Sequence, residues 1–137
     1  MYMKIIVNLN KQYYILYMKY FKLIWNLCVI QNSPRLNIET NPVIFTEGEP
    51  FPEALHNDIN ILIDFDGLDD VLEGFKDVLS GKESESGFAV ELFFYHYDKD
   101  TLEIRYNPDE TVALFHTQDF FDMLSAYQKF RDERKGL

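Results

Sequence analysis

The spacing of apolar residues predicts the clearest helix of the chain between residues 68 and 79. Six side chains recur there at steps of one or three residues and so share one helical face: Leu68, Val71, Leu72, Phe75, Val78 and Leu79. Asp66 stands at the position of an N-cap residue, and Gly81 stands where helices commonly end. A second helix is predicted over residues 118–133, with Thr117 as its cap and its apolar residues turned inward.

Apolar and alternating runs predict strands on both sides of the first helix. Residues 59–65 place isoleucines at alternate positions, so these would share one face of a strand. Residues 88–97 form a longer strand, too rich in aromatics on both faces to be half exposed, and residues 102–106 and 111–117 follow after turn signals. Short turns make the last three strands an antiparallel meander with packed helices. From residue 59 the predicted order is therefore β-α-β-β-β-α, and the fold class is α+β.

The pattern before residue 59 is less regular. Residues 3–9 and residues 43–45 are each predicted as a short strand, and residues 47–58 as a loop stiffened by two prolines. Residues 11–30 are predicted as an aromatic-rich helix, because their polar residues recur at spacings of 7, 3 and 4 and fall on one stripe.

Charge divides the chain at residue 36. Residues 1–36 contain five basic residues and no acid, whereas residues 37–137 contain all 23 acids and eight basic residues. The first segment, a predicted strand and helix, is interpreted either as a structural segment that neutralises part of the acidic α+β body or as a leader-like extension. Because 137 residues suit one domain, the two segments are expected to form one domain together.

The net charge of −10 restricts the kinds of partner. Nucleic-acid phosphates and anionic membranes repel such a chain, whereas a basic protein is a natural partner. Lys19 and Lys22 interrupt the most apolar stretch, so a membrane span is not expected, and a helix lying on a membrane is the alternative for residues 11–30. Cys28 is the single cysteine, and a chain without disulfides suits the cytoplasm.

Residues 61–70 read ILIDFDGLDD and resemble the signature of haloacid-dehalogenase phosphatases, a strand followed by Asp-x-Asp-Gly. The resemblance implies that Asp64 is the phosphoryl-accepting nucleophile and that Asp66 handles the proton of the leaving group. That family uses a doubly wound parallel sheet with further catalytic residues downstream, whereas an antiparallel meander is expected here. A strand end at Asp64 and a helix cap at Asp66 account for the motif without catalysis, so a metal-dependent phosphatase is the less favoured alternative.

Other catalytic and metal-binding patterns are absent from the sequence. It contains no G-x-S-x-G, no G-x-G-x-x-G and no phosphate-binding loop with its lysine. His96 and His116 lie on predicted strands and could be neighbours, but hydrogen-bonded histidines are more common than two-histidine metal sites. No catalytic residue, metal site or cofactor is therefore predicted, and an enzyme is not expected.

Acidic residues form a second stripe on the helix predicted at residues 68–79, opposite its apolar stripe. The candidate partner-binding residues are this stripe, two acids of the next loop and two strand tyrosines: Asp69, Asp70, Glu73, Asp77, Glu83, Glu85, Tyr95 and Tyr97. Like charges four residues apart destabilise a helix by about a few tenths of a kcal/mol per pair. The stripe is interpreted either as a merely solvated face or as a docking surface for a basic protein, which the tyrosines would anchor.

A small acidic α+β domain without catalytic motifs resembles the bacterial immunity proteins of contact-dependent growth inhibition and related polymorphic-toxin systems. The resemblance covers the general character of residues 36–137. It implies a cytoplasmic, non-enzymatic inhibitor that neutralises one cognate toxin, often a nuclease, by covering a basic active site. The alternative is an adaptor or phage-type inhibitor that mimics nucleic acid and binds a different nucleic-acid enzyme.

Overall fold

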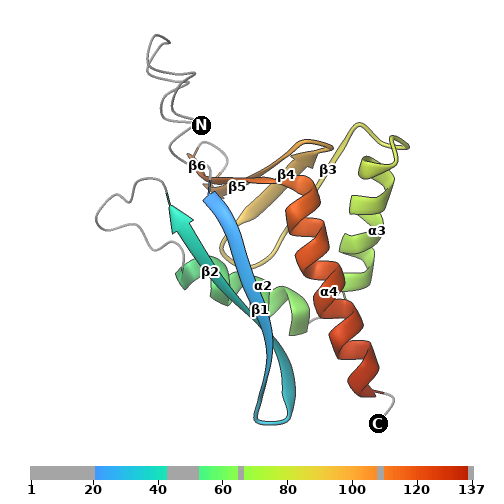
Figure 1. The fold of residues 1–137 in the computed structure, drawn as a ribbon. Coiled ribbons are helices and arrows are strands. Elements are labelled where there is room, and N and C mark those ends of the chain that lie inside the picture. Colours follow the sequence, from blue (N-terminus) through green and yellow to red (C-terminus); the bar gives the residue numbers. More distant parts are fainter. Residues whose placement is uncertain (1–20, 43–52, 65–66, 108–109, 136–137) are drawn as a thin grey trace.

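The computed structural model describes residues 21–42, 53–64, 67–107 and 110–135. Helices and antiparallel strands together confirm the predicted α+β class (Figure 1). The order of elements in the described part of the chain is β1 (Phe21–Ile30), β2 (Ser33–Pro42), α2 (Glu53–Asp64), α3 (Leu68–Leu79), β3 (Glu85–Ala89), β4 (Phe94–Asp98), β5 (Thr101–Asn107), β6 (Glu110–His116) and α4 (Thr117–Lys135).

Strands β3 to β6 form a four-stranded sheet, which is the platform of the fold. Strands that are consecutive in the sequence are neighbours in the sheet, and all pairs are antiparallel, so the predicted meander is confirmed. The prediction of one strand over residues 88–97 is wrong, because β3 ends at Ala89 and β4 begins at Phe94. A turn between them folds the aromatic run into two paired strands.

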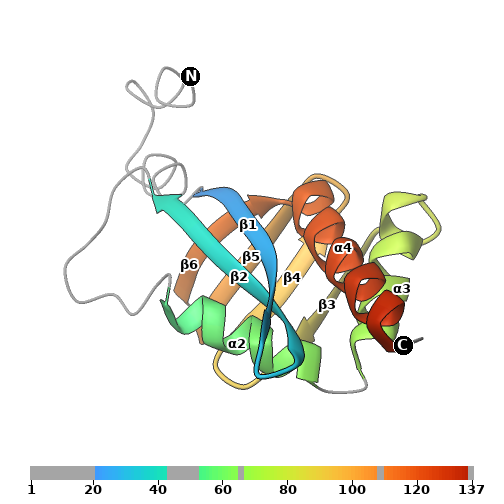
Figure 2. The ribbon, with the colours of Figure 1, turned by 60° about the horizontal axis from the view of Figure 1, so that its bottom comes forward.

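The helices and the β1–β2 hairpin lie on one face of this sheet (Figure 2). Phe75 of α3 stacks on Tyr97 of β4, with 4.2 Å between the ring centroids. Phe120 of α4 lies 6.2 Å from the ring of Tyr95, and Asp58 of α2 accepts a hydrogen bond from the Tyr95 hydroxyl. The hydrophobic core therefore lies between the sheet and the three helices.

Helix α3 has the bounds that its periodicity predicted, Leu68–Leu79. Its buried residues are Leu68, Leu72, Phe75 and Val78. Gly81 has a φ of 87°, the left-handed conformation for which glycine is suited at a helix end. Gly67 is at the N-cap position of α3, and Asp66, which was predicted as the cap, lies outside the described residues.

Helix α4 also lies where it was predicted, with slightly wider bounds. Phe120, Leu124 and Tyr127 are buried at helical spacing. Thr117, the predicted cap, is the first residue of α4, and its hydroxyl donates a hydrogen bond to the carbonyl of Asp98, 2.7 Å away. This bond fastens the start of α4 to the end of β4.

Helix α2 replaces a predicted loop and a predicted strand, so the expectations for residues 47–58 and 59–65 are wrong over residues 53–64. The buried apolar residues of this segment are Leu55, Ile59, Leu62 and Ile63. Their spacings of 4, 3 and 1 are helical, but they begin inside the stretch that was assigned to the loop. The alternating isoleucines at its end imitate a strand.

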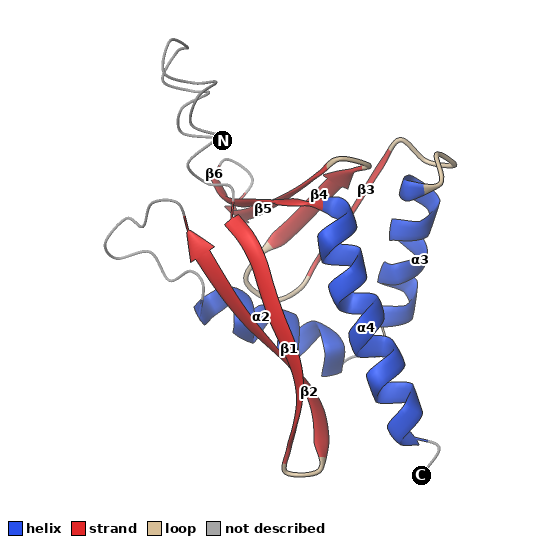
Figure 3. Cartoon of the chain, viewed as in Figure 1, coloured by secondary structure: helices blue, strands red, loops and turns tan. Residues whose placement is uncertain are grey.

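The β1–β2 hairpin replaces the second half of the predicted N-terminal helix, so that prediction is wrong for residues 21–30 (Figure 3). Gln31 and Asn32 connect the strands with φ values of 51° and 66°, which suits a two-residue hairpin turn. Leu36 of β2 is fully buried in the core, so the charge boundary at residue 36 falls inside a packed strand. The strands predicted at residues 3–9 and 43–45 lie outside the described residues.

Candidate protein-binding surface

Helix α3 turns most of its acidic side chains to solvent. Asp70 and Glu73 are exposed, and the side chain of Asp77 is 32% exposed. Lys76 lies 4.0 Å from the carboxylate of Glu73, and Lys82 lies 3.9 Å from that of Asp77. Such solvent-exposed pairs contribute little, about 0–1 kcal/mol each. The outer face of α3 therefore keeps a net negative charge.

Asp69 has a structural role that the sequence did not indicate. Its carboxylate accepts hydrogen bonds from Gln128 at 2.8 Å and from Arg131 at 3.0 Å, so it joins α3 to α4. Burial would lower the pKa of Arg131, but hydrogen bonds to Asp69 and Asp132 outweigh this effect and raise it. Asp69 is therefore less available to a partner than its exposed neighbour Asp70.

The acidic surface continues from α3 into the following loop and strand. Glu83 and Asp70 are exposed and have no ion-pair partner among the described residues. The backbone N–H of Glu83 donates to the carbonyl of Asp77 at 3.0 Å, which holds the loop against the end of α3. Glu85 begins β3 and lies 3.2 Å from the ring of His96. The predicted acids thus lie on one continuous stretch of α3, loop and β3.

Tyr95 and Tyr97 do not belong to this surface, which corrects their prediction as interface anchors. Their side chains are 2% and 1% exposed, because they point from β4 toward the helices. Burial raises the pKa of both phenols, and the nearby carboxylate of Asp58 adds to the effect at Tyr95. The position of the turn before β4 decides which residues face inward, and the expected single long strand concealed that turn.

Asp58 is a buried carboxylate that the sequence pattern did not indicate. It lies on α2, is 1% exposed, and accepts hydrogen bonds from the backbone N–H groups of Glu91 and Leu92 and from the hydroxyl of Tyr95. A buried carboxylate requires such partners. Asp58 lies three residues after Leu55 and one residue before Ile59. This spacing could have placed it on the buried stripe if α2 had been predicted as a helix.

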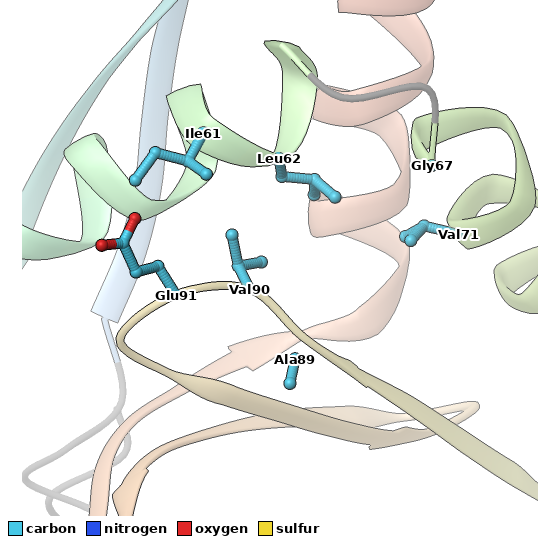
Figure 4. A pocket seen from close by; sticks show the side chains of 7 residues that line it. All are labelled: Ile61, Leu62, Gly67, Val71, Ala89, Val90 and Glu91. Atoms are coloured by element: carbon cyan, nitrogen blue, oxygen red, sulfur yellow. The ribbon is translucent and has the colours of Figure 1, made fainter.

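A groove with a volume of about 400 Å³ lies beside the residues that Asp58 holds (Figure 4). It is formed by the second half of α2, the start of α3 and the turn between β3 and β4. The lining residues are Ile61, Leu62, Gly67, Val71, Ala89, Val90 and Glu91. Among these seven residues Glu91 alone is charged, so the groove has apolar walls and one carboxylate.

The arrangement around Asp64 differs from that of a phosphatase. Asp64 ends a helix instead of a strand, and Arg35 donates a hydrogen bond to its carboxylate. Asp66 lies outside the described residues. No group of three or more histidine, cysteine or acidic side chains is placed to hold a metal ion in the part of the chain that the structure describes. His96 and His116 lie on β4 and β6 with β5 between them, so they are not on adjacent strands.

Comparison of the chain with protein-family models, with curated proteins and with solved structures finds no match. Of the helices in the described ranges, none combines the length and the apolar character needed to cross a bilayer. The acidic surface and the groove are therefore the features of the molecule that bear on its function.

Proposed function

We propose that this chain is a non-enzymatic inhibitor of the immunity type, which binds and neutralises a basic protein in the cytoplasm. The expected partner is a toxin domain, such as a nuclease, with a basic active site. The observation that carries the proposal is the row of exposed carboxylates on α3 and the loop after it, above all Asp70, Glu73 and Glu83. Basic nuclease sites bind phosphates, and carboxylates placed at similar positions would compete with them.

Electrostatic steering gives this surface a specific physical role. A face of one charge raises the association rate of an oppositely charged partner by roughly 10- to 10³-fold. Residues 68–85 carry six acidic residues and two lysines, and Asp69 is the one of the six acids that pairs with an arginine in the described structure. The field of this surface is therefore negative. The repulsion within α3 is only about a few tenths of a kcal/mol per pair, which the packing of its apolar face readily offsets.

The carboxylates are also held on a rigid support. The apolar side of α3 is buried, and its Phe75 stacks on Tyr97 of the sheet. The loop after α3 is tied back by hydrogen bonds from Ser80 and Glu83 to the carbonyl of Asp77. A preorganised surface loses less conformational entropy on binding, which favours affinity.

Affinity purification from the native cells tests the proposal directly. The tagged chain should retain a basic protein at low salt, and added chain should abolish the activity of that protein, for example nucleic-acid cleavage. A variant with neutral residues at Asp70, Glu73 and Glu83 is the matched control, and it should retain less of the basic protein than the wild type does. Recovery of no basic protein, or full partner activity in the presence of excess chain, would contradict the proposal. A retained nucleic-acid enzyme that is not a toxin would favour the nucleic-acid mimic instead.

A further inference from the structure

The groove beside Asp58 combines two kinds of surface. Figure 4 shows Ile61 and Leu62 of α2 facing Val90 and Glu91 across it, with Val71 of α3 on the far side. Most of its wall is aliphatic, and the carboxylate of Glu91 lies at one end. A volume of about 400 Å³ is within the range of ordinary ligand sites, which is about 300–1,000 Å³.

The buried carboxylate of Asp58 holds the groove wall that carries Glu91 in place. One oxygen of the buried Asp58 carboxylate accepts the backbone N–H groups of Glu91 at 3.1 Å and of Leu92 at 2.7 Å. Its other oxygen accepts the hydroxyl of Tyr95 at 2.6 Å. The turn is therefore held to α2, and the fold fixes the position of the groove wall that carries Glu91.

The charge around the groove selects the sign of its occupant. Glu91 is the one charged residue among the seven that line the groove, and the chain as a whole has a net charge of −10. This field repels an anion and attracts a cation. A cationic head can pair with the exposed carboxylate of Glu91, whereas a wholly apolar side chain cannot.

We propose that this groove binds an arginine or lysine side chain of the basic partner. The hydrocarbon stem would lie against Ile61, Leu62 and Val71, and the cationic head would meet the carboxylate of Glu91. Both side chains commonly bury their stems while the charged end stays at the surface. The inference rests on the proposed function for the source of the side chain, and it adds a specific anchor to the acidic surface.

Butylguanidinium is a small probe that tests the groove without the partner. In a titration followed by amide chemical shifts, it should move the signals of the residues at positions 61, 62, 67, 71 and 89–91. Pentanol has a similar chain without the charge and should bind more weakly, and pentanoate should not bind. The absence of shifts at these positions, or equal shifts with the alcohol, would overturn the proposal.

Two variants assign the binding to this groove. Glu91→Gln should weaken the binding of butylguanidinium by roughly two- to fivefold, as expected for a partly exposed charge pair. It leaves the backbone N–H of residue 91 available to Asp58. Glu83→Gln removes the same charge outside the groove and is the matched control, which should change binding less. Equal effects of the two changes would overturn the role of Glu91.

Gly67→Leu is designed to fill the groove. A Cβ atom added at Gly67 meets nothing within 4 Å, and its φ of −80° is ordinary for any residue. The leucine should abolish the probe shifts, whereas Gly67→Ala should retain them. The spectra themselves report folding, and if Gly67→Leu unfolds the chain, Glu91→Gln decides the outcome. Because the probe needs no partner, a failed titration rejects the groove alone, while failed capture of a basic protein rejects the proposed function.

Discussion

Helices α2 and α3 are adjacent, have twelve residues each and carry acidic side chains, but they use them in opposite ways. On α2, Asp58 points into the core and binds three donors. On α3, Asp70 and Glu73 point to solvent and have weak ion pairs or none in the described structure. The stripe of the helix on which a carboxylate lies therefore decides whether it stabilises the fold or remains available to a partner.

This difference has a clear energetic basis. A buried carboxylate is expensive to desolvate, so Asp58 is tolerated only because its hydrogen bonds replace those of water. An exposed carboxylate keeps its water, so it affects stability little and acts mainly through its field. Substitutions of Asp58 on α2 should therefore change mainly stability, whereas substitutions of the exposed acids on α3 should change mainly association with a partner.

The largest loss of stability is expected from Asp58→Ala. The change removes three hydrogen bonds to a charged acceptor, which contribute about 1.5–3 kcal/mol each, and leaves the donors partly buried. We expect the free energy of unfolding to fall by about 3–5 kcal/mol in urea denaturation, since water can reach some of the donors. Asp58→Asn keeps an acceptor and should lose less. A loss below about 1 kcal/mol for the alanine variant would contradict the assigned role.

A smaller loss is expected when the tyrosine partner is changed. Tyr95→Phe leaves one oxygen of the buried Asp58 carboxylate without its donor, so we expect a loss of about 1–3 kcal/mol. Tyr97→Phe is the matched control, because it removes a hydroxyl that is hydrogen-bonded to the neutral side chain of Ser86. Thermal unfolding of both variants measures the difference. An equal or larger loss for Tyr97→Phe would show that Asp58 does not depend on Tyr95.

The two helices also show how much of the fold the sequence could predict. The apolar stripe of α3 is regular and is followed by a glycine, so its bounds were predicted correctly. In α2 the last residues, from Ile59 to Ile63, are mostly isoleucine, and their β-branched side chains favour strands when taken alone. The packing of Leu55 and Ile59 in the core overrides this local preference. Residues 21–30 were misassigned for the opposite reason, because an aromatic strand imitated a helical stripe.

The candidate site was predictable only in part. The exposed acids of α3 follow directly from the helical period, because they lie opposite its apolar residues. Tyr95 and Tyr97 were placed on the surface wrongly, since the facing of a strand depends on where the preceding turn falls. The groove requires α2, α3 and the β3–β4 turn to meet, and contacts between distant segments are not visible in a local pattern.

Neutral substitutions on α3 should change association more than stability. The variant combines Asp70→Asn, Glu73→Gln, Asp77→Asn and Glu83→Gln, and it leaves Asp69 in place because that residue binds Arg131. We expect association with the basic partner to slow about tenfold at low salt, equivalent to about 1.4 kcal/mol. Salt should remove most of the difference, since exposed charges are screened beyond about 8 Å at physiological ionic strength. Stopped-flow mixing at two salt concentrations measures both effects.

The control for this variant removes the same charge from another part of the surface. It changes four exposed acids of the β4–β5 turn and α4: Asp100→Asn, Asp119→Asn, Asp122→Asn and Glu133→Gln. Association should be faster in this control than in the α3 variant at the same ionic strength. Equal rates would mean that net charge alone matters and that α3 is not the docking surface.

A still smaller effect is expected at the end of α2. Asp64→Asn breaks the ion pair with Arg35, but both side chains are partly exposed, so the loss should be about 0–1 kcal/mol. The same variant tests the phosphatase alternative, because a nucleophilic aspartate would be essential. Hydrolysis of a phosphate ester with magnesium should be indistinguishable between wild type and Asp64→Asn. Activity that only the wild type shows would support an enzyme.

The smallest effect concerns Asp98, an exposed carboxylate that nevertheless binds backbone. It accepts the N–H groups of Thr101 and Asp100, both at 2.8 Å, and these bonds lower its pKa below that of an ordinary aspartate. A depressed pKa in the folded state means that the ionised form contributes stability at neutral pH. This contribution is complete above the unfolded pKa of about 3.9 and is lost as the pH falls through the folded value.

Asp98→Asn keeps an acceptor but cannot ionise, so it should be slightly less stable than the wild type at pH 7. The two proteins should converge in acid, once Asp98 of the wild type is protonated. Urea midpoints measured from neutral to acidic pH test this sign, with Asp100→Asn as the control that removes a neighbouring charge from the same turn. A gap between wild type and Asp98→Asn that widens in acid would show that Asp98 does not gain from ionisation. Asp98 would then contribute as little to stability as the solvated acids of α3, instead of an amount intermediate between those acids and the buried Asp58.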